Sequence, residues 1–260
     1  MKLVWMSDLH FVAGKELVIG HDPRQRLEAA IKRINDHHSD ADYCVISGDL
    51  VNRGTKSDYE ELRLLLDQLM IPYLPMAGNH DNRSLLKSVL PIPEGMREFV
   101  QYSVDSDQGL ILCLDSQKEG QDCGEFCRER SAWLEQELER ASGKPALVFI
   151  HHPPVALGLP MQDQDRMEDG EAFLELLNKY SNVAHLFIGH VHRPIAGQMA
   201  GISFTTMRSV LYQAPAPVPV WDWGSFRPGQ EAPAIGVVTA DENSVIVQFE
   251  QFADFETEST

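Results

Sequence analysis

Five apolar runs in the sequence each end in side chains that can bind a metal ion. Glycine stands directly before three of these side chains, Asp49, Asn79 and His190. In open α/β folds, ligand sites lie beyond the carboxyl ends of the strands, and glycine lets the backbone turn sharply there. We therefore predict that the five ends meet at one site. The clusters are "SDLH" with Asp8 and His10, "SGDL" with Asp49, "GNHD" with Asn79 and His80, "HHPP" with His151 and His152, and "GHVH" with His190 and His192.

Each cluster taken alone also has an ordinary explanation. A single D-x-H is common on protein surfaces, and a Gly-Asp pair is usually a turn. His151 and His152 would suit a polar loop that Pro153 ends. An H-x-H in an extended segment puts both imidazoles on one face, which suits a metal but is a weak signal by itself. Five such pieces, all at predicted strand ends, favour a metal centre over chance.

The residue types indicate a centre with two metal ions. Two ions roughly 3.5–4 Å apart need a shared ligand, and a carboxylate such as Asp49 can bridge them. Imidazoles favour iron, zinc, manganese or cobalt over magnesium or calcium. The neutral amide of Asn79 leaves the site positive, where a third carboxylate would cancel the charge. A positive pocket selects a small anion such as a phosphate ester, and nothing in the pattern requires an organic cofactor.

Alternating apolar runs and amphipathic stretches predict an α/β architecture that positions these side chains. Segments 194–207 and 235–252 are typical of meandering β structure. Two architectures therefore remain possible: two stacked sheets, or one mixed sheet followed by a β-rich C-terminal part. We expect Ser57 to cap the second helix, with Glu60 reaching back to it. Strands are predicted at 2–7, 43–48, 72–77, 98–104, 109–115, 146–150 and 184–188, and helices near 24–37, 57–70, 83–89, 128–140 and 170–180.

Composition narrows the class of protein. The chain has 260 residues and a net charge of -17, which disfavours binding to nucleic-acid polymers. No apolar stretch reaches the length of a membrane span. The first residues suit a β-strand rather than a signal peptide, so we expect a cytoplasmic protein. Cys44 and Cys113 lie in strand-like runs, and Cys123 and Cys127 have no second cysteine pair, so four free thiols are expected.

The order D-x-H, G-D, G-N-H-D, H and G-H-x-H resembles that of the calcineurin-like metallophosphoesterase superfamily. The resemblance spans residues 8 to 192. It implies a four-layer αββα sandwich, made of two mixed β-sheets flanked by helices, with a dinuclear metal centre. The length of 260 residues suits one large domain, or one domain with a small appendage, and we expect residues 1–260 to form a single domain of this family. The ions would be divalent or trivalent, from among Fe, Mn, Zn and Co.

The resemblance also implies roles for individual residues. Asp8, His10, Asp49 and His192 would hold one ion, and Asp49, Asn79, His151 and His190 would hold the other. His80 would face the substrate without binding metal. Protein phosphatases of the superfamily carry an aspartate, paired with this histidine, where the chain has Asn52. The role of His80, as proton donor or as electrostatic stabiliser, therefore stays open.

Within the superfamily, the chain is most similar to bacterial cyclic-nucleotide and glycerophosphodiester phosphodiesterases, on "SDLHF", "SGDLVNRG", "AGNHDNR", "LDSQ", "FIHHPP" and "IGHVHRP". This implies hydrolysis of small phosphodiesters, in which a metal-bound hydroxide attacks phosphorus. Hydrolysis of phosphomonoesters at the same centre is the alternative. A non-catalytic scaffold, like the retromer subunit of this fold, is a further one, although every expected ligand position is filled.

The sequence leaves substrate specificity open. The stretch near Arg83 and the segments 156–169 and 208–215 are candidates for contacts with substrate. Arg208 and Tyr212 are candidates for binding a phosphate or a base, with a packed structural role as the alternative. Asn52 and Asp81 are candidates for contacts with the metal ligands or the substrate.

The segment 214–229, "APAPVPVWDWGSFRPG", is rich in proline and aromatic residues. Its prolines deny it a regular ladder, and its apolar residues exceed those of a normal solvated loop. We predict a homo-oligomer, most simply a dimer, in which residues 209–233 contact the partner or cap its pocket. The alternative is that Trp221 and Trp223 pack against the core of their own chain.

Overall fold

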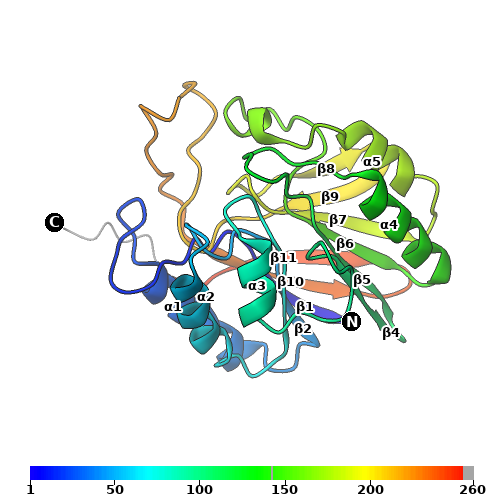
Figure 1. Ribbon diagram of the computed structural model, residues 1–260, viewed down its shortest axis with the longest axis horizontal. Helices are drawn as coiled ribbons and strands as arrows, with labels where there is room; N and C mark the ends of the chain where they lie inside the picture. The colour runs from blue at the N-terminus through cyan, green and yellow to red at the C-terminus, as the bar shows by residue number, and fades with distance from the viewer. Residues whose placement is uncertain (142, 254–260) are drawn as a thin grey trace.

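Two β-sheets lie face to face at the centre of the protein, with helices on both outer sides (Figure 1). The computed structural model describes residues 1–141 and 143–253. The first sheet has the strand order β11-β10-β1-β2-β3, and the second has the order β4-β5-β6-β7-β9-β8. Both combine parallel and antiparallel pairs. The predicted αββα sandwich of two mixed sheets is therefore confirmed, and the alternative with one mixed sheet is wrong.

Element bounds follow the chain in order. The strands are β1 (Lys2–Met6), β2 (Tyr43–Ile46), β3 (Tyr73–Pro75), β4 (Tyr102–Ser106), β5 (Gly109–Leu114), β6 (Ala146–Ile150), β7 (Val183–Ile188), β8 (Ala196–Met199), β9 (Ile202–Thr206), β10 (Ala234–Ala240) and β11 (Val245–Gln251). The helices are α1 (Pro23–His37), α2 (Lys56–Leu66), α3 (Arg83–Val89), α4 (Arg128–Arg140), α5 (Gly170–Leu177) and the short 3-10 helix η1 (Gln162–Asp165).

The core forms because the inner strands are apolar on both faces. In β6, Leu147 and Phe149 belong to the cluster shared with the first sheet, whereas Val148 and Ile150 pack with residues of α4 and α5. This alternation follows from the two-residue period of a strand. Trp5 of β1 joins the sheets, with its ring centroid 6.0 Å from that of Phe149 and 5.2 Å from that of Phe187. Continuous apolar runs thus become strands covered on both faces.

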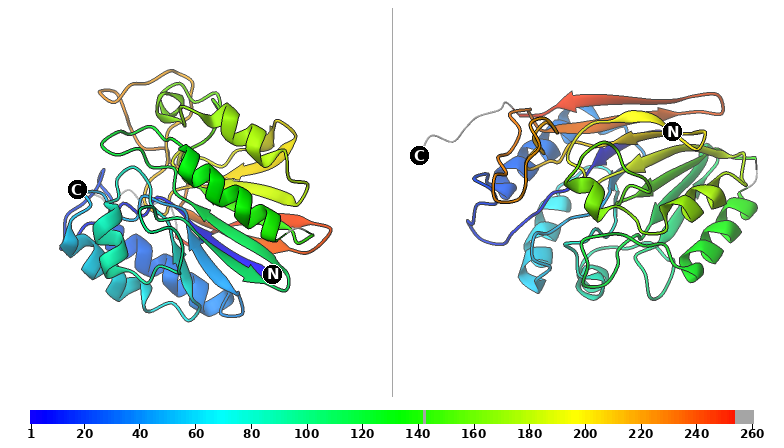
Figure 2. Two further views of the ribbon diagram at one scale, coloured as in Figure 1. Left: turned by 45° about the vertical axis from the view of Figure 1, so that its right-hand side comes forward. Right: turned by 90° about the horizontal axis from the view of Figure 1, so that it is seen from above.

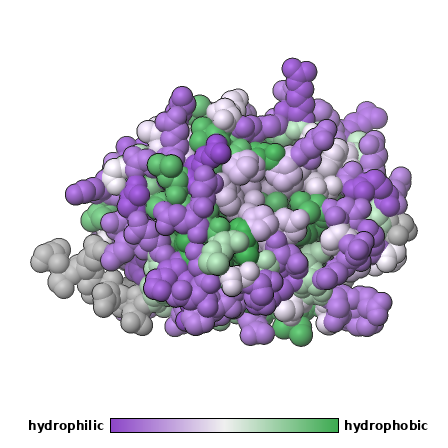
Figure 3. All heavy atoms as spheres, turned by 90° about the horizontal axis from the view of Figure 1, so that it is seen from below, coloured by the Kyte–Doolittle hydropathy of each residue, from purple (hydrophilic) through white to green (hydrophobic). Residues whose placement is uncertain are grey.

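The outer layers are amphipathic helices. Figure 2 shows α1, α2 and α3 on one outer side of the sandwich and α4 and α5 on the other. Mostly hydrophilic atoms cover the face in Figure 3, with scattered apolar side chains, as the charge of -17 leads us to expect. Within residues 1–141 and 143–253, no helix has both the length and the apolar composition to cross a membrane. The four cysteines are free, as predicted, and Cys44 and Cys113 are buried.

The start of α2 differs from the prediction. Thr55 caps the helix, and Asp58 completes the capping box: the Thr55 hydroxyl oxygen accepts from the Asp58 amide at 3.3 Å, and the Asp58 carboxylate accepts from the Thr55 amide at 3.2 Å. Ser57 lies inside the first turn. Thr55 and Asp58 have the same three-residue spacing as the predicted pair Ser57 and Glu60, two positions earlier in the chain. Asp58 is favoured over Glu60 because its carboxylate also accepts a hydrogen bond from the amide of Ala13.

Two other predicted bounds are wrong because, in each case, a backbone amide donates its hydrogen bond to the side chain of a distant residue. The second helix ends at Leu66 rather than near residue 70, and the Met70 amide donates to the side chain of Asn35 at 2.9 Å. The strand predicted at 98–104 begins only at Tyr102, since the Val100 amide donates to the carboxylate of Asp115 at 2.8 Å.

Candidate metal centre

The five clusters predicted from the sequence meet at one end of the sandwich. Parallel strands β1, β2 and β3 of one sheet and β6 and β7 of the other carry them past their carboxyl ends. Four groups of side chains there have ligand atoms within 4.8 Å of one another. These groups are Asp8–His10–His192, Asp8–Asp49–His151, His10–Asp49–His80 and His151–His152–His190.

Asp49 stands between the two halves of this cluster. Its Oδ2 lies 3.7 Å from Nε2 of His10 and 3.5 Å from Nε2 of His151. Burial alone would raise the pKa of Asp49, but His151 and His80 outweigh burial and hold that pKa well below its usual range. Asp49 is thus an ionised carboxylate that faces both halves, which is the geometry required of a bridging ligand.

The first half consists of Asp8, His10 and His192. Nε2 of His10 lies 3.1 Å from Nε2 of His192, and His192 Nε2 lies 3.3 Å from Oδ1 of Asp8. Burial lowers the pKa of His10 to about 3, so its ring is neutral. Asp8 Oδ2 and His10 Nδ1 are buried and have no hydrogen-bond partner in the described part of the chain. Nitrogen and oxygen lone pairs thus converge here, and there are too few N–H or O–H donors to form hydrogen bonds with all of them. Such a set of atoms fits a site for a metal ion.

The second half gathers around the amide of Asn79. Its Oδ1 lies 3.2 Å from Nε2 of His151 and 3.2 Å from Nδ1 of His190. Burial lowers the pKa of His190 to about 3, so this ring too is neutral and can offer a lone pair. With Asp49 Oδ2 beside His151, this half presents two nitrogens and two oxygens. That donor set fits a transition metal or zinc better than magnesium.

Backbone carbonyls fix the tautomers of two of these histidines. Nδ1 of His151 donates to the carbonyl oxygen of Ser47 at 2.8 Å, and Nδ1 of His192 donates to that of Tyr212 at 2.9 Å. Nδ1 of each ring therefore carries a proton, and Nε2 points into the cluster. Such outer hydrogen bonds orient histidine ligands and raise their basicity. Burial alone would lower the pKa of His151, but the Asp49 carboxylate outweighs burial and raises that pKa to about 9. A metal ion that binds Nε2 of His151 would therefore have to displace a proton.

Three glycines make room for the cluster. A Cβ atom added at Gly48 would lie 2.4 Å from Nδ1 of His151, and one at Gly78 would lie 2.3 Å from Oδ1 of Asp49. At Gly189 it would lie 2.6 Å from the Ser7 hydroxyl oxygen. These distances are shorter than van der Waals contact, so any side chain here would displace a candidate ligand.

The backbone is left-handed at five of the candidate ligands, a feature that the sequence did not reveal. Their φ angles lie between 42° and 67°. Residues other than glycine rarely adopt this conformation, and it costs about 1–2 kcal/mol at each residue. Strain of this kind concentrates at functional sites, where the surrounding structure maintains it. The five residues are Asp8, His10, Asp49, His190 and His192.

His80 differs from the other histidines. It is exposed, its ring centroid lies 4.8 Å from that of His10, and its amide donates to Oδ1 of Asp49 at 2.9 Å. Nδ1 of His80 donates to the backbone carbonyl of Asn52 at 3.0 Å. The backbone carbonyl of Asn52 thus orients His80 in place of a carboxylate, and it does so through Nδ1 rather than Nε2.

His152 differs from its neighbour His151 because both of its ring nitrogens contact protein groups outside the ligand cluster. Its Nδ1 lies 2.8 Å from the Ser116 hydroxyl oxygen, and its Nε2 donates to the carbonyl oxygen of Asp122 at 3.1 Å. Both ring nitrogens have protein partners, so His152 supports the loops beside the centre.

Asp81 holds the loops after β2 and β3 together. Its Oδ2 accepts from the amides of Leu50 at 3.1 Å and Gly78 at 2.9 Å, and its Oδ1 accepts from the hydroxyl of Tyr59 at 2.9 Å. Asp81 therefore contacts the loops that carry Asp49 and Asn79 rather than a substrate.

Arg83 also has a structural position. Its guanidinium forms a two-pronged pair with Asp115, at 2.7 and 2.9 Å, and the Asp115 side chain is fully buried. Such geometry gives a strong ion pair, and it fixes the first residue of α3 to the end of β5. Arg83 is thus engaged by the protein itself rather than presented to a substrate.

Replacing Arg83 by alanine is expected to lower the free energy of unfolding by about 3 kcal/mol, because the buried charge of Asp115 loses its main partner. Chemical denaturation measures this change. Arg97→Ala is the matched control, since the Arg97 side chain is 96% exposed, and it should change stability by no more than about 0.5 kcal/mol. Equal stabilities of the two variants would contradict the assignment.

A cavity of about 390 Å³ opens above the cluster. The predicted site residues His10, Asp49, Asn52, Asn79, His80, His190, His192 and Tyr212 line it, and so do Gln162 and Asp165 from the segment 156–169. Val18, Ile19 and Asp122 line it as well and were not predicted, because nothing in their local sequence distinguishes them from ordinary loop residues. Arg208 is not part of the described lining, and its guanidinium lies 3.5 Å from the carbonyl oxygen of Ala232.

The aromatic segment lies over this same cavity. Trp221, Trp223 and Phe226 are among the lining residues, and the Trp223 residue is 61% exposed. The alternative in which both tryptophans pack into the core of their own chain is therefore wrong. The segment instead forms one wall of its own chain's site.

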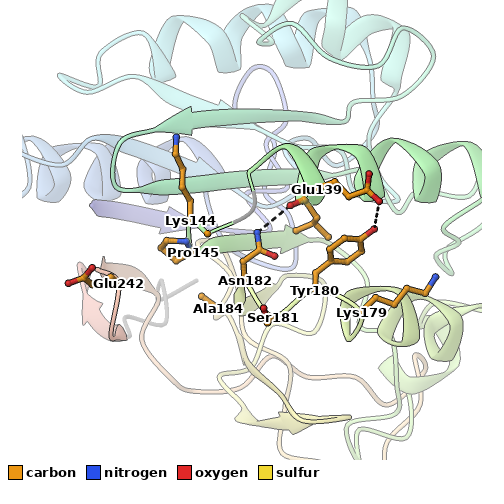
Figure 4. A pocket seen from close by; sticks show the side chains of 11 residues that line it. Glu139, Lys144, Pro145, Lys179, Tyr180, Ser181, Asn182, Ala184 and Glu242 are labelled. Atoms are coloured by element: carbon orange, nitrogen blue, oxygen red, sulfur yellow. Dashed lines mark hydrogen bonds between the residues drawn. The ribbon is translucent and has the colours of Figure 1, made fainter.

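A second hollow, of about 550 Å³, lies at the opposite ends of β6 and β7 (Figure 4). Its two lysines are paired within the protein: Lys179 with Glu135 at 3.1 Å, and Lys144 with Asp105 at 2.7 Å. The Asn182 amide donates to backbone carbonyls of α4 and the residue after it. None of the ligand clusters found among the described residues lies in this hollow.

Comparison with known proteins agrees with this geometry. A probable cyclic nucleotide phosphodiesterase of Rhodopseudomonas palustris is 36% identical over 82% of this chain and 79% of its own length. A glycerophosphodiester phosphodiesterase of Enterobacter lignolyticus is 30% identical over 83% of this chain and 79% of its own. A dimetal phosphatase from Danio rerio shares the fold with a TM-score of 0.68 at 14% identity, over 97% of this chain and 96% of its own. The family model of the calcineurin-like phosphoesterases matches residues 1–194, so the chain belongs to this family of phosphoester hydrolases.

Proposed function

We propose that the protein is a metal-dependent phosphodiesterase that hydrolyses small phosphodiesters of the cyclic-nucleotide or glycerophosphodiester type. The names of its relatives support a diester substrate. The observation that carries the proposal is the charge of the cavity. Among its described lining residues there is no lysine or arginine, whereas Asp122 and Asp165 are present. A diester has one negative charge and a monoester nearly two at neutral pH, so these carboxylates favour the diester.

The clustering of the candidate ligands supports the two-ion arrangement that the family resemblance implies. Two ions held there would lower the pKa of a water molecule and bind the oxygens of the phosphate. The ions proposed are divalent or trivalent, from among Fe, Mn, Zn and Co, and no organic cofactor is involved. Asp8, His10, Asp49 and His192 would hold one of them, and Asp49, Asn79, His151 and His190 the other.

The reaction adds the elements of water across one ester bond. The oxygen of water bonds to phosphorus, the P–O bond to the leaving alkoxide breaks, and the alkoxide takes up a proton. Nδ1 of His80 is engaged by Asn52, so a doubly protonated His80 ring carries its second proton on Nε2, facing the cavity. We assign to His80 the donation of this proton to the leaving oxygen.

Turnover of two p-nitrophenyl esters tests the proposal. Protein loaded with Mn²⁺ should hydrolyse bis(p-nitrophenyl) phosphate with a higher kcat/KM than p-nitrophenyl phosphate. The reverse order would identify a phosphomonoesterase. Protein that holds two metal ions per chain and hydrolyses neither ester would contradict an enzymatic role.

The proposal includes one domain over residues 1–260, a cytoplasmic location and a symmetric dimer with residues 209–233 at the contact. Val218 and Val220 on this segment are 79% and 72% exposed, which is costly in water and typical of a protein contact. Light scattering measures the mass in solution. A monomer, or a Val218→Ser, Val220→Ser variant that remains a stable dimer, would contradict this part of the proposal.

A further inference from the structure

Four aromatic rings form one wall of the cavity. Within the segment 214–229, the ring centroids of Trp221, Trp223 and Phe226 lie 5.2 to 5.6 Å from one another. Tyr212 extends the group, with its centroid 6.0 Å from that of Phe226. These rings contact one another in edge and tilted arrangements, which are favourable between aromatic side chains.

The wall begins at the metal centre and ends at the surface. The Tyr212 ring lies 4.5 Å from that of His192 and 5.5 Å from that of His10, which are both candidate metal ligands. Trp223, by contrast, is 61% exposed. Figure 1 shows this segment, in orange, as a loop that projects from the body of the molecule on the side of the loop before α5. A ligand bound at the centre therefore has aromatic surface along its path out.

Such a wall suits a flat, apolar group better than water. Large aromatic surfaces are normally buried in a core, and here they face an open cavity that has a size typical of small-molecule sites. Every nucleobase has a π-face that stacks on such rings without regard to its hydrogen-bonding pattern. A glycerol group offers no ring to stack.

We propose that Trp221, Trp223 and Phe226 form the binding wall for the base of a nucleoside phosphodiester. This inference rests on the proposed function and narrows it from small phosphodiesters in general to nucleotides. The phosphate lies at the metal centre, the ribose passes Tyr212, and the base stacks on the tryptophans. The single negative charge of a cyclic nucleotide also suits a cavity that is lined by Asp122 and Asp165.

The test compares two diesters in two proteins. The wild type loaded with Mn²⁺ should prefer 3′,5′-cyclic AMP over glycerophosphoethanolamine in kcat/KM. The Trp221→Leu, Trp223→Leu variant should reduce this preference about 5- to 150-fold, chiefly through KM, as expected for base–aromatic stacking of about 1–3 kcal/mol at 1.36 kcal/mol per tenfold change. The tryptophans lie on an irregular segment outside the core clusters, so the fold should survive.

Trp133→Leu is the matched control. Trp133 lies on α4, packed against the second core cluster and outside the lining of the cavity, and its replacement should leave the preference unchanged. A wild type without preference for the nucleotide, or a double variant that retains the preference, would overturn the inference.

A binding measurement separates this inference from the proposed function. Titration of the wild type with 3′,5′-cyclic AMP should quench tryptophan fluorescence, and the same titration with glycerophosphoethanolamine should not. Quenching without hydrolysis of any diester would contradict the proposed function and support the wall. Hydrolysis of glycerophosphoethanolamine without quenching by the nucleotide would support the proposed function and contradict the binding wall.

Discussion

Asp49→Ala is expected to abolish hydrolysis and to release most of the bound metal. The Asp49 carboxylate is the group that faces both halves of the cluster, with Oδ2 between His10 and His151. Without it, each half loses one ligand and the negative charge that offsets two cations. Activity should fall to the background rate, and elemental analysis should show far fewer than two metal ions per chain.

Asp36→Ala is the matched control for this variant. Asp36 is a surface aspartate that pairs with Lys32 on α1 and belongs neither to the cavity lining nor to the ligand clusters, so its replacement should change neither metal content nor turnover. An Asp49→Ala variant that kept two ions and normal turnover would show that the bridge has been misassigned.

His80→Ala is expected to lower kcat by roughly 10²- to 10⁴-fold while metal content stays nearly intact, because His80 is placed to donate a proton and holds no ion in the proposed scheme. The loss should be small for p-nitrophenol esters, whose leaving group needs little protonation, and large for alkyl esters. Parallel assays of bis(p-nitrophenyl) phosphate and an alkyl diester measure the difference.

Equal losses for good and poor leaving groups would reject proton donation and favour electrostatic stabilisation by His80. Asn52→Asp supplies a useful comparison. Nδ1 of His80 is held by the backbone of Asn52 rather than by its side chain. This variant should therefore keep the ring oriented and retain most of the activity.

The location of the site could be predicted from the sequence because it depends on local features. An apolar run followed by glycine and a ligand indicates a strand end, and parallel strands place such ends at one edge. His10, Asp49 and His190 therefore come together as expected. The family resemblance then assigned each residue to an ion, which spacing alone does not do.

Features that depend on distant partners could not be predicted. The amide of Val100 leaves the ladder because Asp115, fifteen residues later, accepts its hydrogen bond. The backbone of Asn52, rather than its side chain, orients His80, and no residue type reveals that. Trp221 and Trp223 lie on a segment without any periodic pattern, so the sequence showed their apolar character but not which surface they would line.

The left-handed backbone at five candidate ligands has a consequence for the life of the protein in a cell. Strain of about 1–2 kcal/mol at each residue is a sizeable fraction of the stability of an ordinary domain. A ligand that binds only the folded chain adds to its stability, by about 4 kcal/mol when its concentration is a thousand times Kd. Metal supply would then govern abundance as well as catalysis. Chains that fold while metal is scarce would carry the strain without this compensation, and they would be the first to reach the proteases that remove unfolded protein.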